Sequence, residues 1–305
     1  MNRDFTFTFW GVRGSHPVPQ PYALKFGGNT TCLEIRAAGA VVIIDAGTGI
    51  IKLGEKLAQE FFTSGEKILE LTILFTHLHH DHTQGLPFFT PLYLGQSHLH
   101  FFGPRNFGGE LSVTLERSMI PPNFPIDFYH SNSVKEVETI KENNMIIISP
   151  DSKTPKLINK FQNEVKPAEN DMVISIMNDY SHPANGVFVY KIEYKNRAFI
   201  FATDVEGYIF GNSKLIEFAK GADYLIHDAQ YTKEQYVGLP TPKQGFGHST
   251  AEMAIEVAKR AEVKNLILTH HDPSATDSDL RKRQSYYRRR FRNLTYAYEG
   301  LTVKL

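Results

Sequence analysis

Short apolar runs that end abruptly in a polar residue are the feature that most limits how this chain can fold. Such runs, rich in β-branched and aromatic residues, are typical of buried strands. The runs and the polar residues that follow are 41–44 before Asp45, 71–76 before His77, 199–203 before Asp204, 224–226 before His227 and Asp228, and 266–269 before His270. The pattern predicts that strands of a sheet system direct His and Asp side chains to one edge.

Helical and alternating stretches lie between these runs. Residues 50–62 and 251–261 each carry apolar side chains on one helical face, and Ser249 with Glu252 predicts a capping box at the start of the second helix. Alternation in 5–9 and 187–194 predicts antiparallel strands. We therefore expect an α/β protein with sheets packed together and helices outside.

The least regular part of the chain is the stretch from 118 to 167, which is rich in proline and aromatic residues and has one possible strand at 145–149. Two interpretations stay open for it. It is either an insertion or lid that lines a cleft, or a packed surface connection.

The overall composition excludes several classes of protein. Of the 305 residues, 41% are hydrophobic, and 33 Lys and Arg balance 33 Asp and Glu, so no global field draws the molecule onto nucleic acid or an anionic membrane. One cysteine, Cys32, cannot build a disulfide framework or a thiolate zinc site. With no secretory leader and no long apolar run, we expect a soluble, cytoplasmic protein without a membrane segment.

A dense cluster of metal-binding side chains directly follows the second apolar run. His77, His79, Asp81 and His82 lie within THLHHDHTQG, where a strand and a tight loop can turn alternate side chains into one space. Imidazole and carboxylate groups without thiolate suit Zn, Mn or Fe. The cluster predicts a metal site rather than a solvated polar turn.

These four residues match the HxHxDH signature of the metallo-β-lactamase superfamily, which the chain resembles over nearly its whole length. Later motifs follow in the family's order, with His182 in YSHPANG, Asp204 in FIFATDVEG and His270 in LILTHHDP. The resemblance implies one domain over 1–305 with the αββα sandwich, two mixed sheets with helices outside.

The resemblance also implies a centre with two divalent ions, Zn or Mn, with Fe as a further option. His77, His79 and His182 would hold one ion, Asp81, His82 and His270 the other, and Asp204 would bridge them. Asp45 would orient histidine ligands from behind. His80 and His271 are not expected to be ligands, although either could line the cleft.

Such a pair of ions can hold a bridging hydroxide and clamp the oxygens of a displacement at phosphorus, which predicts hydrolysis. His248, in GHSTAE, resembles the His-Ser-Thr motif of the RNase Z-like phosphodiesterase branch, whose histidine contacts the phosphate and protonates the leaving oxygen. Asp228 stands where that branch has its acidic partner. We count His248, Asp228 and Asp81 as the catalytic residues.

The substrate is expected to be small. RNase Z grips tRNA with a long arm between the third histidine and the bridging aspartate, and the stretch from His182 to Asp204 is too short for one. The resemblance then favours a cyclic nucleotide or a similar small phosphodiester over a large RNA, and implies a homodimer. Ser15, His16 and Asn29, in glycine-containing loops near the amino terminus, are candidate substrate contacts.

Two alternatives stay open at this point. One is an RNA-processing endonuclease that uses the arginine-rich stretch 281–292, with Tyr286, Tyr287 and Phe291 interleaved, in place of the missing arm. A solvated helix face with its aromatic residues turned inward is the more common outcome for such a stretch. The other is a carboxylic ester, thioester or lactam hydrolase on the same metal site.

Overall fold

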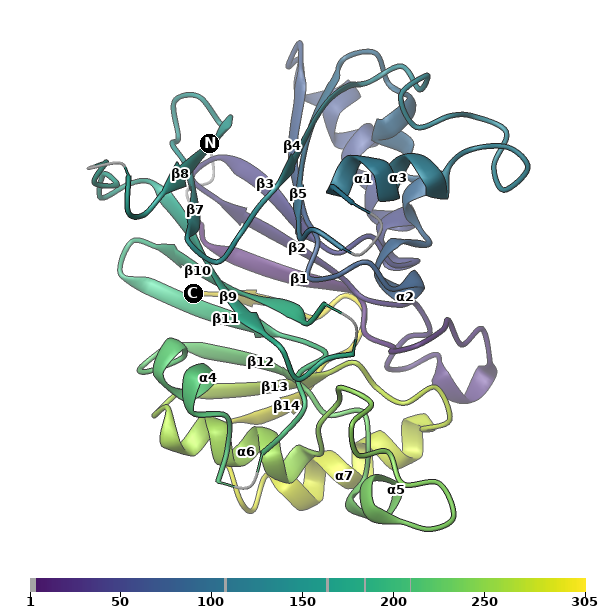
Figure 1. Ribbon diagram of the computed structural model, residues 1–305, viewed down its shortest axis with the longest axis vertical. Coiled ribbons are helices and arrows are strands. Elements are labelled where there is room, and N and C mark those ends of the chain that lie inside the picture. The colour runs from purple at the N-terminus through teal and green to yellow at the C-terminus, as the bar shows by residue number, and fades with distance from the viewer. Residues whose placement is uncertain (1–3, 107–108, 163–164, 184, 209) are drawn as a thin grey trace.

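Two mixed β-sheets pack face to face, with helices on the outer face of each, as Figure 1 shows for this computed structural model. The structure describes residues 4–106, 109–162, 165–183, 185–208 and 210–305. Within them the first sheet has seven strands in the order β15-β1-β2-β3-β4-β5-β6, and the second has eight in the order β14-β13-β12-β11-β10-β9-β7-β8. The predicted αββα layering is confirmed.

The strands of each sheet have the following bounds. The first sheet contains β1 (Thr6–Gly11), β2 (Cys32–Ala37), β3 (Ala40–Ile44), β4 (Leu69–Leu74), β5 (Ser97–Gly103), β6 (Val134–Thr139) and β15 (Thr302–Lys304). The second contains β7 (Asn144–Ile148), β8 (Pro155–Asn159), β9 (Met172–Asp179), β10 (Val187–Tyr194), β11 (Arg197–Ala202), β12 (Tyr224–Asp228), β13 (Asn265–Thr269) and β14 (Leu294–Tyr296). Every apolar run singled out above forms a strand.

Each sheet combines an antiparallel part with a parallel part. In the first sheet β3, β4, β5 and β6 are parallel, and in the second β11, β12, β13 and β14 are parallel. Parallel strands end at the same edge, and ligand sites in such sheets lie beyond their carboxyl ends. The antiparallel pairing predicted for the strands around 5–9 and 187–194 is confirmed.

Apolar side chains from both sheets fill the space between them. Phe7 of β1 and Phe199 of β11 are fully buried, with ring centroids 4.7 Å apart, and belong to one continuous cluster with side chains of β2, β9 and β10. Alternation along β1 turns Phe7 and Phe9 into this layer and the threonines outward, and Phe5, just before the strand, joins the same layer. The core therefore fixes the inner face of one sheet against the inner face of the other.

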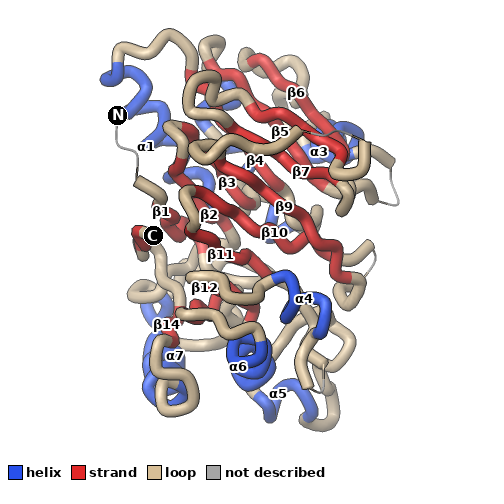
Figure 2. The backbone as a smooth tube through the Cα atoms, turned by 90° about the vertical axis from the view of Figure 1, so that its left-hand side faces the viewer, coloured by secondary structure: helices blue, strands red, loops and turns tan. Residues whose placement is uncertain are grey.

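Helices cover the two outer faces, which both views show (Figures 1 and 2). Helices α1 (Gly49–Ser64) and α3 (Leu111–Ser118) pack on the first sheet, and α4 (Ser213–Phe218), α6 (Ala251–Arg260) and α7 (Asp277–Tyr287) on the second. Two short helices, α2 (His80–Thr83) and α5 (Lys233–Val237), lie in connections.

The predicted capping box of α6 is wrong in its residue. The N-cap is Thr250, whose hydroxyl accepts from the Met253 amide. Ser249 lies one residue before the cap, is fully buried, and donates its hydroxyl to the Val205 carbonyl.

The stretch 118–167 is more regular than its composition suggests. It contributes β6 to the edge of the first sheet and β7 and β8 to the edge of the second, and so connects the two sheets. Six of its ten proline and aromatic (Phe, Tyr) residues lie in the turns before β6. Of the two interpretations left open, the packed connection fits these strands.

In the described part of the chain, no helix combines the length and the apolarity needed to cross a membrane.

Candidate metal centre

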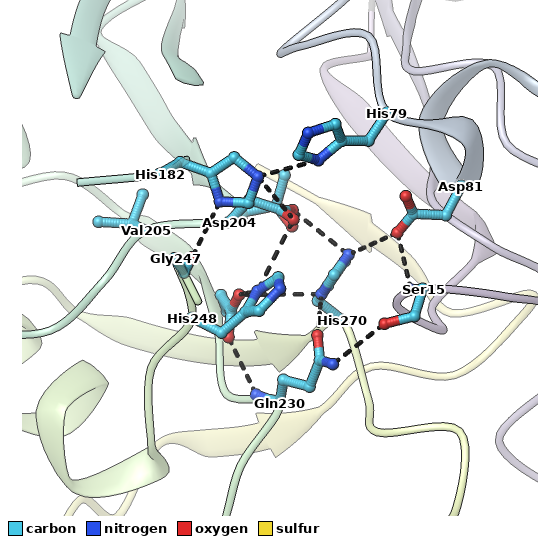
Figure 3. A network of polar contacts seen from close by, with 12 residues as sticks. Ser15, His79, Asp81, His182, Asp204, Val205, Gln230, Gly247, His248 and His270 are labelled. Atoms are coloured by element: carbon cyan, nitrogen blue, oxygen red, sulfur yellow. Dashed lines mark hydrogen bonds and ion pairs between the residues drawn. The ribbon is translucent and has the colours of Figure 1, made fainter. Parts of the chain in front are cut away.

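The candidate ligands lie in loops that follow strands of both sheets. His77 and His79 come after β4, and Asp81 and His82 lie in α2 immediately beyond. From the second sheet, His182 lies between β9 and β10, Asp204 follows β11 and His270 follows β13. Figure 3 shows Asp204 between His182 and His270, with Asp81 facing His270 from the other side. The structure therefore brings together all seven predicted ligands.

At three strand ends, a residue just after the strand adopts the left-handed backbone conformation. The φ angles of Asp45, Asp204 and His270 are 64°, 58° and 58°. This region is unfavourable for residues with a Cβ, and such strain concentrates at functional sites. Each sharp turn directs the side chain out of the sheet and into the space between the loops.

Three histidines form the first group, which we call the histidine group: His77, His79 and His182. The Nδ1 atom of His79 lies 3.0 Å from the Nε2 atoms of both His77 and His182. Nitrogen atoms so close together fit the ligands of one tetrahedral ion. His79 is exposed, whereas the other two are buried, so this group opens toward solvent.

The second group, which we call the carboxylate group, comprises Asp81, His82, Asp204 and His270, all buried. Asp81 Oδ2 lies 3.4 Å from His82 Nε2 and 3.2 Å from His270 Nε2. Asp204 Oδ2 lies 3.3 Å from each of the same two nitrogens.

Asp204 faces both groups. Its other oxygen, Oδ1, lies 3.8 Å from His77 Nε2 and 4.0 Å from His182 Nε2. One carboxylate oxygen thus points to each group, which is the arrangement expected of a bridging ligand.

Hydrogen bonds behind the ligands fix which nitrogen faces the centre. His82 Nδ1 donates to Asp45 Oδ2 at 2.8 Å, and Thr76 donates its hydroxyl to the same oxygen. Because that hydroxyl has one proton, it accepts from His77 Nδ1 at 3.1 Å. The role predicted for Asp45 behind the histidines fits this geometry, and Nε2 of both imidazoles is left with a free lone pair.

The ligands from the second sheet are held in the same way. His182 Nδ1 donates to the Gly247 carbonyl at 3.1 Å, and His270 Nδ1 donates to Gln230 Oε1 at 2.8 Å. Gly247 has a φ of 84°, and a Cβ there would lie 2.1 Å from the His182 ring. Glycine is therefore required for the loop to approach this histidine.

The carboxylate group has the chemistry of a cation site. His82 Nε2 is buried and has no hydrogen-bond partner, although buried polar atoms normally have one. Burial by itself lowers the pKa of His82, but Asp81, Asp204 and Asp45 raise it well above its usual value. Positive charge is thus strongly favoured at this point, and a divalent metal would satisfy both the lone pair and the carboxylates.

His248 and Asp228 form a buried pair beside the two groups. His248 Nδ1 donates to Asp228 Oδ2 at 2.7 Å and lies 3.7 Å from Asp204 Oδ1. Burial lowers the pKa of His248, but the Asp228 carboxylate outweighs it and the result is a pKa of about 9. Aspartate at position 228 therefore reaches the histidine, and it holds a charged imidazolium next to the centre.

A surface cavity of about 460 Å³ opens over these groups. It is lined by Ser15, Leu78, His79, His80, Asp81, Asp204 and His248. A substrate that enters it meets ligands of both groups and His248 together.

The predicted substrate contacts are placed differently from one another. Ser15 lines the cavity, and its amide donates to Asp81 Oδ2 at 2.7 Å. His16 is exposed and bonds its neighbouring Pro17 carbonyl, and Asn29 is held by Glu299. Neither is among the residues that line the cavity, so the structure does not bring these two side chains to the candidate site.

The two histidines set aside as non-ligands also differ. His80 lines the cavity. His271 is fully buried, donates from Nε2 to the Ala297 carbonyl and stacks on Tyr296. Neither belongs to the histidine or the carboxylate group.

Several residues of the site escaped the sequence interpretation. Gln230 is buried, orients His270, and donates to the Ser15 hydroxyl at 3.2 Å. Glu206 is buried and accepts from the Gly247 amide at 2.6 Å and from the Gly245 amide at 3.0 Å. Only the position of Gln230, two residues after Asp228, gave a signal that could have been noticed.

Comparisons with known proteins agree with this geometry. A model of the β-lactamase superfamily domain matches residues 41–271, which include all seven candidate ligands. A curated ribonuclease Z from Thermoplasma acidophilum is 26% identical over 312 residues, covering 92% of this chain and 90% of the relative. A curated ribonuclease Z from Pyrococcus horikoshii is 24% identical over 294 residues, covering 87% of this chain and 85% of the relative.

A solved structure has a similar fold. The short form of human tRNase Z is 20% identical, has a TM-score of 0.62, and the match covers 98% of each chain.

Proposed function

Because the chain belongs to the metallo-β-lactamase superfamily, as a hydrolase of its RNase Z-like branch, we propose that it is a metal-dependent phosphodiesterase in which His248 protonates the leaving oxygen. One observation carries the proposal. The His248–Asp228 pair lies in the same cavity as the two groups of candidate ligands. Hydrolysis of a phosphodiester with a poor leaving group needs such a proton donor, whereas lactam or activated ester hydrolysis depends on it less.

Two divalent ions are proposed, Zn or Mn, with Fe as a further option. His77, His79 and His182 would hold one, Asp81, His82 and His270 the other, and Asp204 would contribute one oxygen to each. Imidazole and carboxylate ligands without thiolate suit these metals. When bound, such ions supply an activated water and stabilise negative charge on the phosphoryl oxygens.

The side chains of this protein would supply positioning and proton transfer. Asp228 keeps His248 charged and directs its remaining N–H, on Nε2, away from the carboxylate. The imidazolium can then donate to an oxygen of the phosphodiester and transfer its proton as the P–O bond breaks. Ser15, whose amide donates to Asp81, lines the same cavity.

The proposed substrate is a small phosphodiester, such as a 3',5'-cyclic nucleotide. The interval between His182 and Asp204 supports this choice, because β10 and β11 fill it as a tight hairpin. Lys195 and Asn196 form its turn with φ angles of 49° and 61°, which suit a two-residue connection. A substrate-gripping arm of the kind expected for large RNA has no room in this interval.

RNA is a second candidate, and the names of the relatives favour it. Two curated relatives that match most of this chain are ribonucleases Z. Their identities of 26% and 24% leave room for a change of substrate within the same chemistry.

A substrate screen tests the proposal. Protein reconstituted with Zn or Mn is assayed on cyclic nucleotides, on a linear model diester, on a tRNA precursor, and on a thioester and a β-lactam. We expect turnover of phosphodiesters, with cyclic nucleotides preferred, and loss of the cyclic-nucleotide turnover in the His248→Ala variant. Cleavage of the tRNA precursor alone would replace the small substrate by RNA. Thioester or lactam turnover that survives His248→Ala would overturn the phosphodiesterase proposal.

A further inference from the structure

Strongly basic residues lie in the middle of α7 and in the turn that follows it. We define the basic surface as seven cationic residues: Arg281, Lys282, Arg283, Arg288, Arg289, Arg290 and Arg292. They occupy a stretch of 12 residues that contains no acidic residue. The remaining 26 Lys and Arg face 33 Asp and Glu, so the rest of the chain carries a net charge of −7. Neutrality of the whole molecule therefore hides a sharp local concentration of positive charge.

Aromatic residues of this stretch, rather than its cations, pack against the core of the protein. Tyr287 is buried against the second sheet and donates to Glu252, and Phe291 packs on the same core. All of the cations except Arg283 are exposed. Tyr286 is the exception among the aromatic residues, since half of its side chain is exposed.

The exposed cations make few contacts with other residues of the protein. Within the described residues, none of the seven forms an ion pair. Arg288 donates to the Leu294 carbonyl, and Arg290 lies over the Tyr286 ring, 5.3 Å from its centroid. Charge at a helix C-terminus stabilises the helix by about 0.3–1 kcal/mol, but only within the last turn, so most of the seven charges are not needed for folding.

We propose that the basic surface binds single-stranded nucleic acid through its backbone phosphates, with Tyr286 and Arg290 as a stacking platform for a base. Six of the seven cations are arginines, whose planar guanidinium forks match phosphate oxygens in pairs. Aromatic rings interleaved with cations are the usual composition of such surfaces. The negative charge on the rest of the chain repels a polyanion and so confines it to this surface.

An anionic membrane fits the surface less well. Helices that lie on membranes insert Leu, Phe or Trp side chains next to their cations. Between residues 281 and 292, Tyr286 is the one large apolar side chain among the exposed ones.

The carboxyl-terminal part of the basic surface, from Arg288 to Arg292, lies at the opposite end of β13 from the metal centre. Asn293, next to Arg292, contacts Lys264 and Leu266 at the start of β13, whereas His270 follows the end of that strand. That part of the surface would thus hold a segment of the nucleic acid remote from any bond that is cleaved. The inference goes beyond the proposed function and does not depend on it, because binding here needs no hydrolysis.

Fluorescence anisotropy with a labelled single-stranded RNA and the matching DNA tests the proposal, with full-length, metal-loaded protein. The test variant combines Arg281→Gln, Arg289→Gln, Arg290→Gln and Arg292→Gln, which spare Arg288 and its bond to Leu294. The control variant removes the same charge from four ion-paired lysines, by Lys153→Gln, Lys191→Gln, Lys214→Gln and Lys304→Gln.

We expect the test variant to bind at least about tenfold more weakly, and its plot of log affinity against log salt to be shallower by about 3, since each phosphate contact on a single strand contributes about 0.7. The control variant should bind as the wild type does. Tyr286→Ala should weaken binding without changing the salt slope. Turnover of a small diester should be unchanged in all variants.

Three results would overturn the proposal. The first is no measurable binding of either nucleic acid by the wild type. The second is an equal loss in the control variant, which would indicate unspecific attraction. The third is binding to phosphatidylserine vesicles in preference to nucleic acid. Because binding and turnover are measured separately, failure here leaves the phosphodiesterase proposal standing, and the reverse also holds.

Discussion

The histidine group and the carboxylate group are close neighbours, but they differ in charge and in exposure. His77, His79 and His182 bring three neutral imidazoles and one exposed member, whereas the carboxylate group is fully buried and includes Asp81 and Asp204. A cation is attracted more strongly to buried carboxylates than to imidazoles alone. The difference predicts that the two proposed ions bind with different affinity. The carboxylate group should bind its ion more tightly, and the ion in the histidine group should exchange more readily.

The largest effect is expected for Asp204→Asn, which removes the one charge that both groups share. Turnover should fall by about 10³-fold or more, which corresponds to about 4 kcal/mol of lost transition-state stabilisation. Metal analysis of the purified variant should show less than the wild-type content, while circular dichroism confirms that the variant is folded. Full metal content with wild-type turnover would mean that Asp204 does not bridge the groups.

The next largest effect is expected for His248→Ala, which leaves both groups intact. Loss of the proton donor should lower kcat by about 10²–10⁴-fold for a substrate with an alkoxide leaving group. A p-nitrophenyl diester, whose leaving group needs no proton, should be affected much less. Asp228→Asn should show the same pattern in a weaker form. An equal loss on both substrates would point to a role for His248 other than proton donation.

A smaller effect, mainly on the carboxylate group, is expected for Asp45→Asn, because Asp45 contacts His82 directly and His77 only through Thr76. The change weakens the bond that orients His82 and removes a buried negative charge. Loss of such a support typically costs about 10–100-fold in metal affinity. Competition with a chromophoric chelator should show that the affinity of the tighter metal-binding step falls toward the affinity of the weaker step. A shift of the weaker step alone would contradict the assignment.

The smallest effect is expected for Glu206→Gln, on the side of the histidine group. Glu206 holds the Gly247 amide, and the Gly247 carbonyl orients His182. We expect the weaker metal-binding step to lose about tenfold in affinity, near the lower limit for such supports, with the tighter step unchanged. Tyr236→Phe, which removes only a hydroxyl that donates to Glu206, is the matched control and should change less. Equal shifts of both steps would show that Glu206 acts on overall stability.

Much of this arrangement could be predicted because strand ends carry the chemistry. The runs before Asp45, His77 and Asp204 are apolar because they are buried, and each ends in a polar residue because the chain leaves the core there. Local pattern therefore locates the candidate ligands. The sharp left-handed turn at Asp204 was not predictable, since nothing in the neighbouring residues demands it.

What could not be predicted depends on contacts between distant loops. Gln230 meets His270 across 40 residues, and Glu206 meets Gly247 across 41. Such long-range pairs leave no periodic pattern in the sequence. The contact between Asn29 and Glu299, which are 270 residues apart, could not be seen from the sequence either.

The candidate ligands come from both sheets, and this has a consequence for the mechanical strength of the molecule. His77 follows β4 of the first sheet, whereas His182, Asp204 and His270 follow strands of the second. An ion held by both would cross-link the two sheets at the edge where these strands end. Its binding free energy would add to the free energy of unfolding. Chelation should therefore lower the melting temperature and speed amide hydrogen exchange first at this edge, while the aromatic layer around Phe7 and Phe199 stays protected.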